Sequence, residues 1–177
     1  MKAAGLITSI QATTAAYRNR LKAVTAATFV STPTAGGWSY SEVYAHIFDL
    51  SILSLDAIDR CLSPDAKPRP THFITRAILF FGAFPPLMKF KVPRQFESSV
   101  RKISIEEATQ LINAFELKLE QYEEKVIQAN PLLKTAHPRL GYLNALQWLR
   151  FTEIHLKHHL KQLNRIARQD NFTSLRP

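Results

Sequence analysis

Three of the chain's six histidines lie within five positions, in the segment FTEIHLKHHLKQL (151–163). His155 and His159 are four residues apart, so on a helix their side chains lie on one face, a turn apart. This spacing lets two imidazoles reach one metal ion, but two ligands alone make a poor site. A third candidate, His46, lies far upstream in SEVYAHIFDLSIL. One histidine from one helix and an H-x-x-x-H pair from another indicate a metal held inside a helical bundle.

The directions of these histidines on their helices favour the same interpretation. At about 100° per residue, an apolar stripe shares the direction of His46, and another shares that of His155 and His159. His158 lies to one side, while Glu153 falls almost opposite His155, so we expect its carboxylate to be solvated. The stripe residues are Val43, Leu50, Leu53 and Ala57 for His46, and Trp148, Phe151, Gln162 and Ile166 for His155.

A buried histidine has a simpler explanation, which stays open at this point. A single histidine on an apolar face is usually a core residue whose hydrogen bonds are satisfied. Three imidazoles converging on one interior are costly unless something compensates them, and a shared divalent metal would satisfy three ring nitrogens at once. We therefore expect His46, His155 and His159 to be metal ligands.

Three protein nitrogens would leave one coordination position open. Closed structural zinc sites use four protein ligands, whereas three histidines and a water form the catalytic arrangement. The spacing does not select the metal, because imidazole suits several divalent ions; zinc or nickel is expected before iron. The sequence contains no G-x-S-x-G elbow and no glycine-rich phosphate loop, so nucleophilic-triad and nucleotide chemistries find no support, and no catalytic residue is identified.

Helix-start signals place these residues in an all-α four-helix bundle. In each signal, a small polar residue is followed three positions later by Glu or Gln, which together can satisfy exposed backbone N–H groups. The signals predict helices over 39–62, 104–129 and 144–168, and an apolar stripe from Ile7 to Val24 predicts the first helix. A long crossover, 63–103, separates the second helix from the third and holds a short helix near 72–82. Strands have no comparable support. The start signals are Ser39 with Glu42, Ser104 with Glu107, and Asn144 with Gln147.

Composition bounds the remaining possibilities. The 177 residues fit one domain, 1–177, and the lone Cys61 can form no disulfide within the chain, so a cytoplasmic protein is expected. The net charge of +9 raises the possibility of nucleic-acid or anionic-surface binding through the basic stretch 67–102, which carries a single acid, Glu97. That stretch is proline-rich and irregular, and the longest apolar run is too short to cross a bilayer, so we expect neither a nucleic-acid nor a membrane partner.

The segments GGWSYSEVYAHI (36–47) and HPRLGYLNALQWLRFTEIHLKHHLKQL (137–163) resemble the DinB-like superfamily of four-helix metal-binding proteins. The second is most similar to a branch known as a domain of unknown function, in which a His-Pro-x-x-Gly turn precedes the last helix. The resemblance implies the same ligand set, His46, His155 and His159. It also implies an enzyme that transfers a low-molecular-weight thiol, such as bacillithiol or mycothiol, to a small electrophile.

Two further expectations concern the surroundings of the site. Aromatic and basic residues of the crossover are candidates for the pocket wall, with core filling as the alternative; they are Phe73, Arg76, Phe80, Phe81 and Phe84. His72 and His137 are not expected to be ligands, although His137 is a candidate for supporting the site. A homodimer is expected, because Ile52 and Leu55 are apolar outside the inward stripes. A non-catalytic metal- or ligand-binding bundle remains the alternative function.

Overall fold

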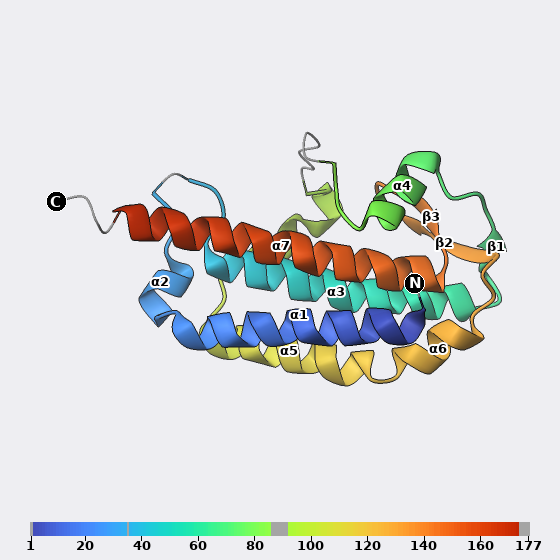
Figure 1. The fold of residues 1–177 in the computed structure, drawn as a ribbon, viewed down its shortest axis with the longest axis horizontal. Coiled ribbons are helices and arrows are strands. Elements are labelled where there is room, and N and C mark those ends of the chain that lie inside the picture. The colour runs from blue at the N-terminus through green and yellow to red at the C-terminus, as the bar shows by residue number, and fades with distance from the viewer. Residues whose placement is uncertain (1, 35, 86–91, 174–177) are drawn as a thin grey trace.

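Four long helical segments lie side by side in the computed structural model (Figure 1). It describes residues 2–34, 36–85 and 92–173, the last five by their backbone alone. The segments are α1 (Ala3–Ala23), α3 (Tyr40–Leu62), α5 (Ile105–Leu119) with α6 (Tyr122–Gln128), and α7 (Ala145–Thr173). Each buries one apolar stripe against the others, so the predicted all-α four-helix bundle is confirmed.

The three predicted helix starts are present with their reciprocal hydrogen bonds. At α3 the Glu42 N–H donates to Ser39 Oγ (3.3 Å) while the Ser39 N–H donates to the Glu42 carboxylate (2.8 Å). Ser104 and Glu107 form the same box at α5, and Asn144 and Gln147 form it at α7. Each cap contributes about 1 kcal/mol and fixes where its helix begins, which sets the phase of every side chain that follows.

The third helix is shorter than predicted. The sequence predicts one helix to about residue 129, but α5 ends at Leu119 and α6 begins at Tyr122. Neither proline nor glycine causes the break. In α6, Tyr122 Oη donates to the Asp59 carboxylate of α3, and Lys125 Nζ binds the other oxygen of that carboxylate at 2.8 Å. We attribute the break to this contact between helices, which a single-helix pattern does not contain.

The crossover between α3 and α5 covers one side of the bundle and contains the predicted short helix, α4 (Phe73–Phe81), and a 3₁₀ turn, η1 (Arg94–Ser99). It also contains a strand that the sequence did not predict, β1 (Lys67–Pro68). This pairs antiparallel with β2 (Leu133–His137), which pairs antiparallel with β3 (Gly141–Leu143). Gly141 closes the turn with φ +74°, a conformation that favours glycine. The sheet ties the crossover to the segment that leads into α7.

The core is aromatic in the middle of the bundle. Tyr17 packs edge to face against both Tyr44 and Phe48, and all three rings are fully buried. Two residues of α3 differ in burial from the sequence prediction. Leu53, expected on the inward stripe, is 44% exposed, whereas Leu55, expected to be free for a dimer contact, is fully buried. Cys61 is buried. Homodimer formation stays a prediction.

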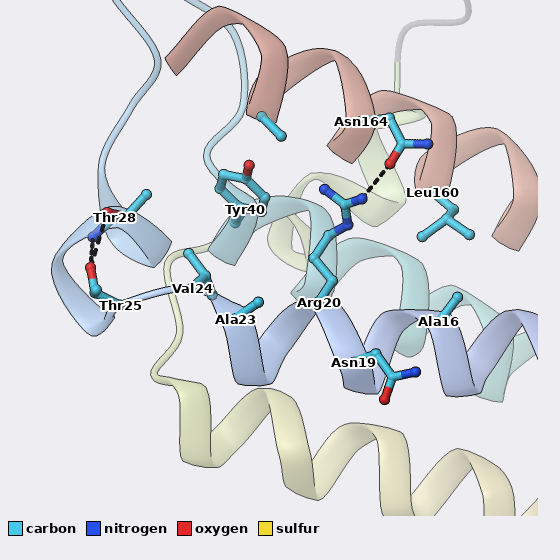
Figure 2. A pocket seen from close by; sticks show the side chains of 11 residues that line it. Ala16, Asn19, Arg20, Ala23, Val24, Thr25, Thr28, Tyr40, Leu160 and Asn164 are labelled. Atoms are coloured by element: carbon cyan, nitrogen blue, oxygen red, sulfur yellow. Dashed lines mark hydrogen bonds between the residues drawn. The ribbon is translucent and has the colours of Figure 1, made fainter. Parts of the chain in front are cut away.

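At the far end of the bundle, α1 turns into the short helix α2 (Ala26–Val30), which packs against α3 and buries Phe29. Figure 2 shows this end, where α1, α2 and α7 surround a hollow. No helix in the described part of the chain has both the length and the apolar character to cross a membrane.

Candidate metal centre

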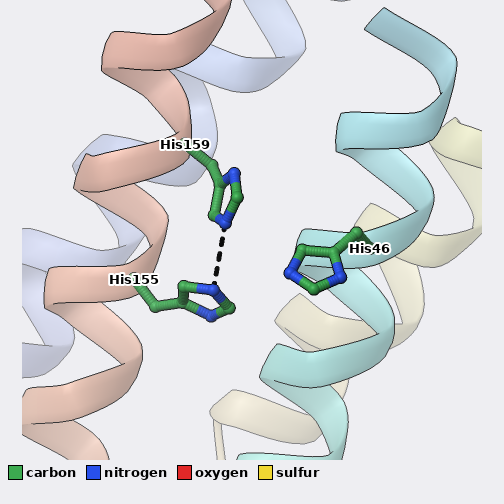
Figure 3. A group of neighbouring side chains, drawn as sticks. All are labelled: His46, His155 and His159. Atoms are coloured by element: carbon green, nitrogen blue, oxygen red, sulfur yellow. Dashed lines mark hydrogen bonds between the residues drawn. The ribbon is translucent and has the colours of Figure 1, made fainter. Parts of the chain in front are cut away.

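The three histidines predicted as ligands come together between α3 and α7. All three are buried, and one ring nitrogen from each forms a group within 4.8 Å of one another. The Nε2 atoms of His155 and His159 are 3.0 Å apart, and the His46 ring faces both from α3 (Figure 3). This proximity follows from the helix phases, because His155 and His159 lie one turn apart and α3 packs along α7.

The hydrogen bond of His46 leaves one defined nitrogen for the cluster. His46 Nδ1 lies 2.9 Å from Ser99 Oγ, and the Ser99 hydroxyl donates its proton to the Phe96 carbonyl oxygen at 2.6 Å. Since that hydroxyl proton is already used, Ser99 Oγ accepts and His46 Nδ1 carries the hydrogen. The lone pair of His46 is therefore on Nε2.

His159 is fixed in the same way by a different partner. Its Nδ1 lies 2.7 Å from Gln162 Oε1, an amide oxygen that can only accept, so His159 Nδ1 also carries the hydrogen. Its Nε2, like that of His46, then has a lone pair directed at the cluster, where it accepts a hydrogen bond from His155 Nε2 at 3.0 Å. Metal-ligating histidines commonly have such a partner on the other ring nitrogen, because it fixes the tautomer and the ring orientation.

Burial keeps these rings neutral. It lowers the pKa of His46 to about 4, and it lowers the pKa values of His155 and His159 well below their usual range, with the neighbouring histidines acting in the same direction. A neutral imidazole is the form that binds a metal. The residues present thus fit a divalent ion in donor type and in their neutral state, and their ring nitrogens lie close together.

Aromatic rings surround the cluster. Trp38 lies edge-on to His46, with ring centroids 4.9 Å apart, and is parallel to His159 at 6.0 Å. Phe151 stacks on His155 at 5.3 Å, and Phe84 contacts both His155 and His158. These apolar walls limit the access of water, which explains the low pKa values.

Only one of the five crossover residues predicted as wall candidates lies against the histidines. Phe84 does so, whereas Phe73, Phe80 and Phe81 are each more than 70% exposed, and Arg76 is exposed. The exposed phenylalanines fill neither the pocket wall nor the core. Trp38 was part of the family-like segment, but it carried no predicted role.

Glu153 is buried, which corrects the expectation that it would be solvated. Its carboxylate accepts from Ser9 Oγ of α1 at 2.5 Å, from Lys157 Nζ at 2.6 Å and from the Arg150 guanidinium. Burial raises the pKa of this carboxyl, but the bonds from Lys157, Ser9 and Arg150 outweigh it, so the net pKa is lowered. The prediction failed because it considered α7 alone, while α1 and α4 also pack on that helix.

The remaining histidines lie outside the cluster. His158 is exposed, with its ring 5.1 Å from that of His159. His137 Nδ1 accepts from the backbone N–H groups of Arg139 and Leu140, and its ring contacts Phe151 at 4.5 Å. His137 therefore packs against Phe151, the ring that stacks on His155, and does not contact the cluster as a ligand would. His72 is exposed and directly precedes α4, without a capping hydrogen bond from its side chain.

Ser99 and Gln162, which orient two of the histidines, had no role in the sequence prediction. Gln162 could have been identified, because it follows His159 by three residues on one helix face. Ser99 carries no local signal, since it is 53 residues from His46 and is placed by the fold of the crossover.

A helical bundle with a buried three-histidine cluster between two of its helices is thus the class that the fold and the site define. The family model of the DinB superfamily matches residues 9–163, and the chain belongs to this superfamily, whose members typically bind metal. The crystal structure of TT2238, a four-helix bundle protein, is similar with a TM-score of 0.61 and 20% identity, covering 93% of this chain and 99% of that chain. This likeness supports the fold alone. Among curated proteins there is no match.

Proposed function

We propose that His46, His155 and His159 bind one divalent metal ion through their Nε2 atoms. The observation that carries the proposal is the pair of outer hydrogen bonds. His46 gives its Nδ1 hydrogen to Ser99 and His159 gives its own to Gln162, so both free lone pairs are directed at one small volume. In a core histidine that served packing alone, the nitrogen without a proton would accept a hydrogen bond from a donor of the surrounding core, whereas here these nitrogens face other imidazoles.

We further propose that the centre is enzymatic and acts on a low-molecular-weight thiol and a small electrophile. Three protein ligands leave a coordination position for the thiol sulfur, and a bound divalent ion supplies the charge that favours loss of the thiol proton. Zinc and nickel are the first candidates and iron the next. Support comes from the family and from the donor set, which contains no fourth protein ligand among the described residues.

The chain's own residues would have three tasks in this reaction. Ser99 and Gln162 hold the imidazoles in the ligand tautomer, and Trp38 and Phe84 keep water away from the reacting sulfur. His158 lies at the exposed edge of the cluster. Partial desolvation of its ring, with help from Arg165 and Lys161, lowers its pKa, so a neutral ring can accept the thiol proton. The sulfur lone pair then forms the bond to the carbon of the electrophile, while the bond between that carbon and its leaving group breaks and its electron pair departs with the leaving group.

Cobalt substitution tests this function directly. The cobalt-loaded protein is titrated with cysteine, glutathione and bacillithiol, and the absorption spectrum is followed for a sulfur-to-metal charge-transfer band. We expect a band with at least one thiol, growing with pH near neutrality, and its loss in His155→Ala. The His158→Ala variant should keep the band and lose turnover. If no thiol changes the spectrum of a loaded site that is open to water, the transferase proposal fails and a non-catalytic metal-binding bundle becomes the better account.

A further inference from the structure

The hollow at the end of the bundle, between α1, α2 and α7, lies apart from the histidine cluster (Figure 2). Its volume is about 700 Å³, the size of a small-molecule site. None of the three clustered histidines lines it. Its walls are part apolar and part polar: Ala16, Ala23, Val24, Leu160 and Ala167 on one hand, and Asn19, Arg20, Thr25, Thr28, Tyr40 and Asn164 on the other.

Arg20 is held in place in this hollow without a counter-charge. Its guanidinium donates to Asn164 Oδ1 and, at 3.4 Å, to the Leu163 carbonyl oxygen, both on α7. These are neutral acceptors. Its Nε is buried and has no hydrogen-bond partner within the described residues. No described carboxylate lies within ion-pair distance of it.

Arg18, two residues earlier on the same helix, has an acidic partner and serves as a comparison for Arg20. Its guanidinium binds both carboxylate oxygens of Glu116 on α5, at 3.2 and 2.6 Å. Arg101 and Arg150, the other described arginines that bond a side chain, also do so with an acid. Arg20 therefore differs in having a fixed guanidinium whose charge is left uncompensated.

The surrounding charges reinforce the positive field of the hollow. Residues 1–41 contain no acidic residue, and no acid lines the hollow. The Arg20 charge reaches the buried Tyr17 and Tyr44, where it acts to lower pKa values that burial raises. An anion is the ligand that such a field attracts.

We infer that this hollow is a second ligand site, which binds a small monocarboxylate with an apolar body. One cation with neutral hydrogen-bonding neighbours matches a single negative charge, whereas a phosphate dianion would need further cations. The alanines, Val24 and Leu160 supply the surface for a short hydrocarbon chain. The site is separate from the proposed metal centre and requires no metal.

Calorimetric titration of the 177-residue chain with hexanoate tests the inference. Hexanamide, which has the same shape without the charge, and inorganic phosphate are the comparison ligands. We expect hexanoate to bind in the millimolar range or tighter, and both comparison ligands to bind at least about tenfold more weakly, because a charge-assisted hydrogen bond is lost or the apolar body is missing.

Matched variants locate the binding. Arg20→Gln should weaken hexanoate binding about tenfold or more, and Arg18→Gln, on the same helix, should not. Ala23→Leu adds apolar bulk at an exposed lining position that should not disturb folding, so it keeps the test valid if Arg20→Gln fails to fold, and it should also abolish binding. Absence of hexanoate binding, unchanged affinity in Arg20→Gln and Ala23→Leu, or equal affinity for phosphate would each overturn the inference.

Discussion

Two buried polar groups on α7, only two residues apart, are treated by the fold in opposite ways. Glu153 faces α1 and has three donors for its carboxylate: Ser9, Lys157 and Arg150. His155 faces α3 and has as its polar neighbours two more neutral bases, His46 and His159. In the first cluster, the negative charge of Glu153 is balanced by Arg150 and Lys157, and its carboxylate oxygens have hydrogen-bond donors. In the second, the Nε2 atoms of His155 and His159 share one hydrogen bond at 3.0 Å, and the lone pair of His46 Nε2 is directed at the same small volume.

The difference separates a structural cluster from the proposed metal-binding one. A compensated buried ion pair satisfies itself, and it joins α7 to α1 and, because Arg150 Nε also donates to the Leu79 carbonyl oxygen at 3.0 Å, to α4. Nitrogen lone pairs that converge on one small volume are stabilised by a shared cation, which is the role proposed for the metal. Removing a member of the first cluster should therefore reduce stability, while removing a member of the second should reduce metal affinity.

The largest stability effect is expected for Glu153→Ala. The variant leaves the Arg150 guanidinium, whose side chain is 21% exposed, without its acid, while Lys157 can turn to water. We expect the free energy of unfolding to fall by about 2–4 kcal/mol, measured by urea denaturation of the metal-free protein. Zinc stoichiometry should stay unchanged. Glu120→Ala, at an exposed position, is the control. If the free energy of unfolding changes equally little in both variants, the cluster has no structural role.

The partners of the histidines should show the reverse pattern. Ser99→Ala and Gln162→Leu remove the acceptors that fix the tautomers of His46 and His159, so zinc affinity should fall about 10- to 100-fold. Ser9→Ala is the matched control, because it removes a hydroxyl partner from Glu153 and should leave zinc affinity as it is. Competition with a chelating dye measures all three. If Ser9→Ala weakens zinc binding as much as Ser99→Ala does, the two clusters are not independent.

A smaller effect is expected for the pH dependence of stability. Burial lowers the pKa of His137 to about 4, from an ordinary value of 6.5. Between these values the unfolded chain takes up a proton that the folded chain does not, so the free energy of unfolding falls as the pH drops from 6.5 to 4. For the metal-free protein we expect His137→Asn to reduce this slope by up to about 1.4 kcal/mol per pH unit. The exposed His72→Asn should not change it, and an unchanged slope in His137→Asn would contradict the buried, neutral state.

The parts that the sequence predicted correctly depend on local spacing. The capping pairs at Ser39, Ser104 and Asn144 act within four residues, so they locate α3, α5 and α7 without any tertiary information. The i, i+4 spacing of His155 and His159 likewise needs only a helix. His46 was placed with them because its apolar stripe required it to face inward.

The parts that the sequence did not predict depend on contacts between distant segments. Glu153 was expected to be solvated, since the helical pattern of α7 contains neither Ser9 nor the packing of α4. Ser99 reaches His46 through the crossover, and the α5–α6 break coincides with the Asp59 contacts of α6. In each case a tertiary partner decides the outcome.

Zinc titration of metal-free protein, purified without a metal-binding tag, tests the central claim most directly. We predict one zinc per chain, with affinity lowered about a hundredfold or more in each of His46→Ala, His155→Ala and His159→Ala, which exceeds the effect of losing an outer partner. His158→Ala should bind zinc like the wild type. A stoichiometry near zero, or a loss in His158→Ala as large as in His155→Ala, would contradict the three-histidine centre.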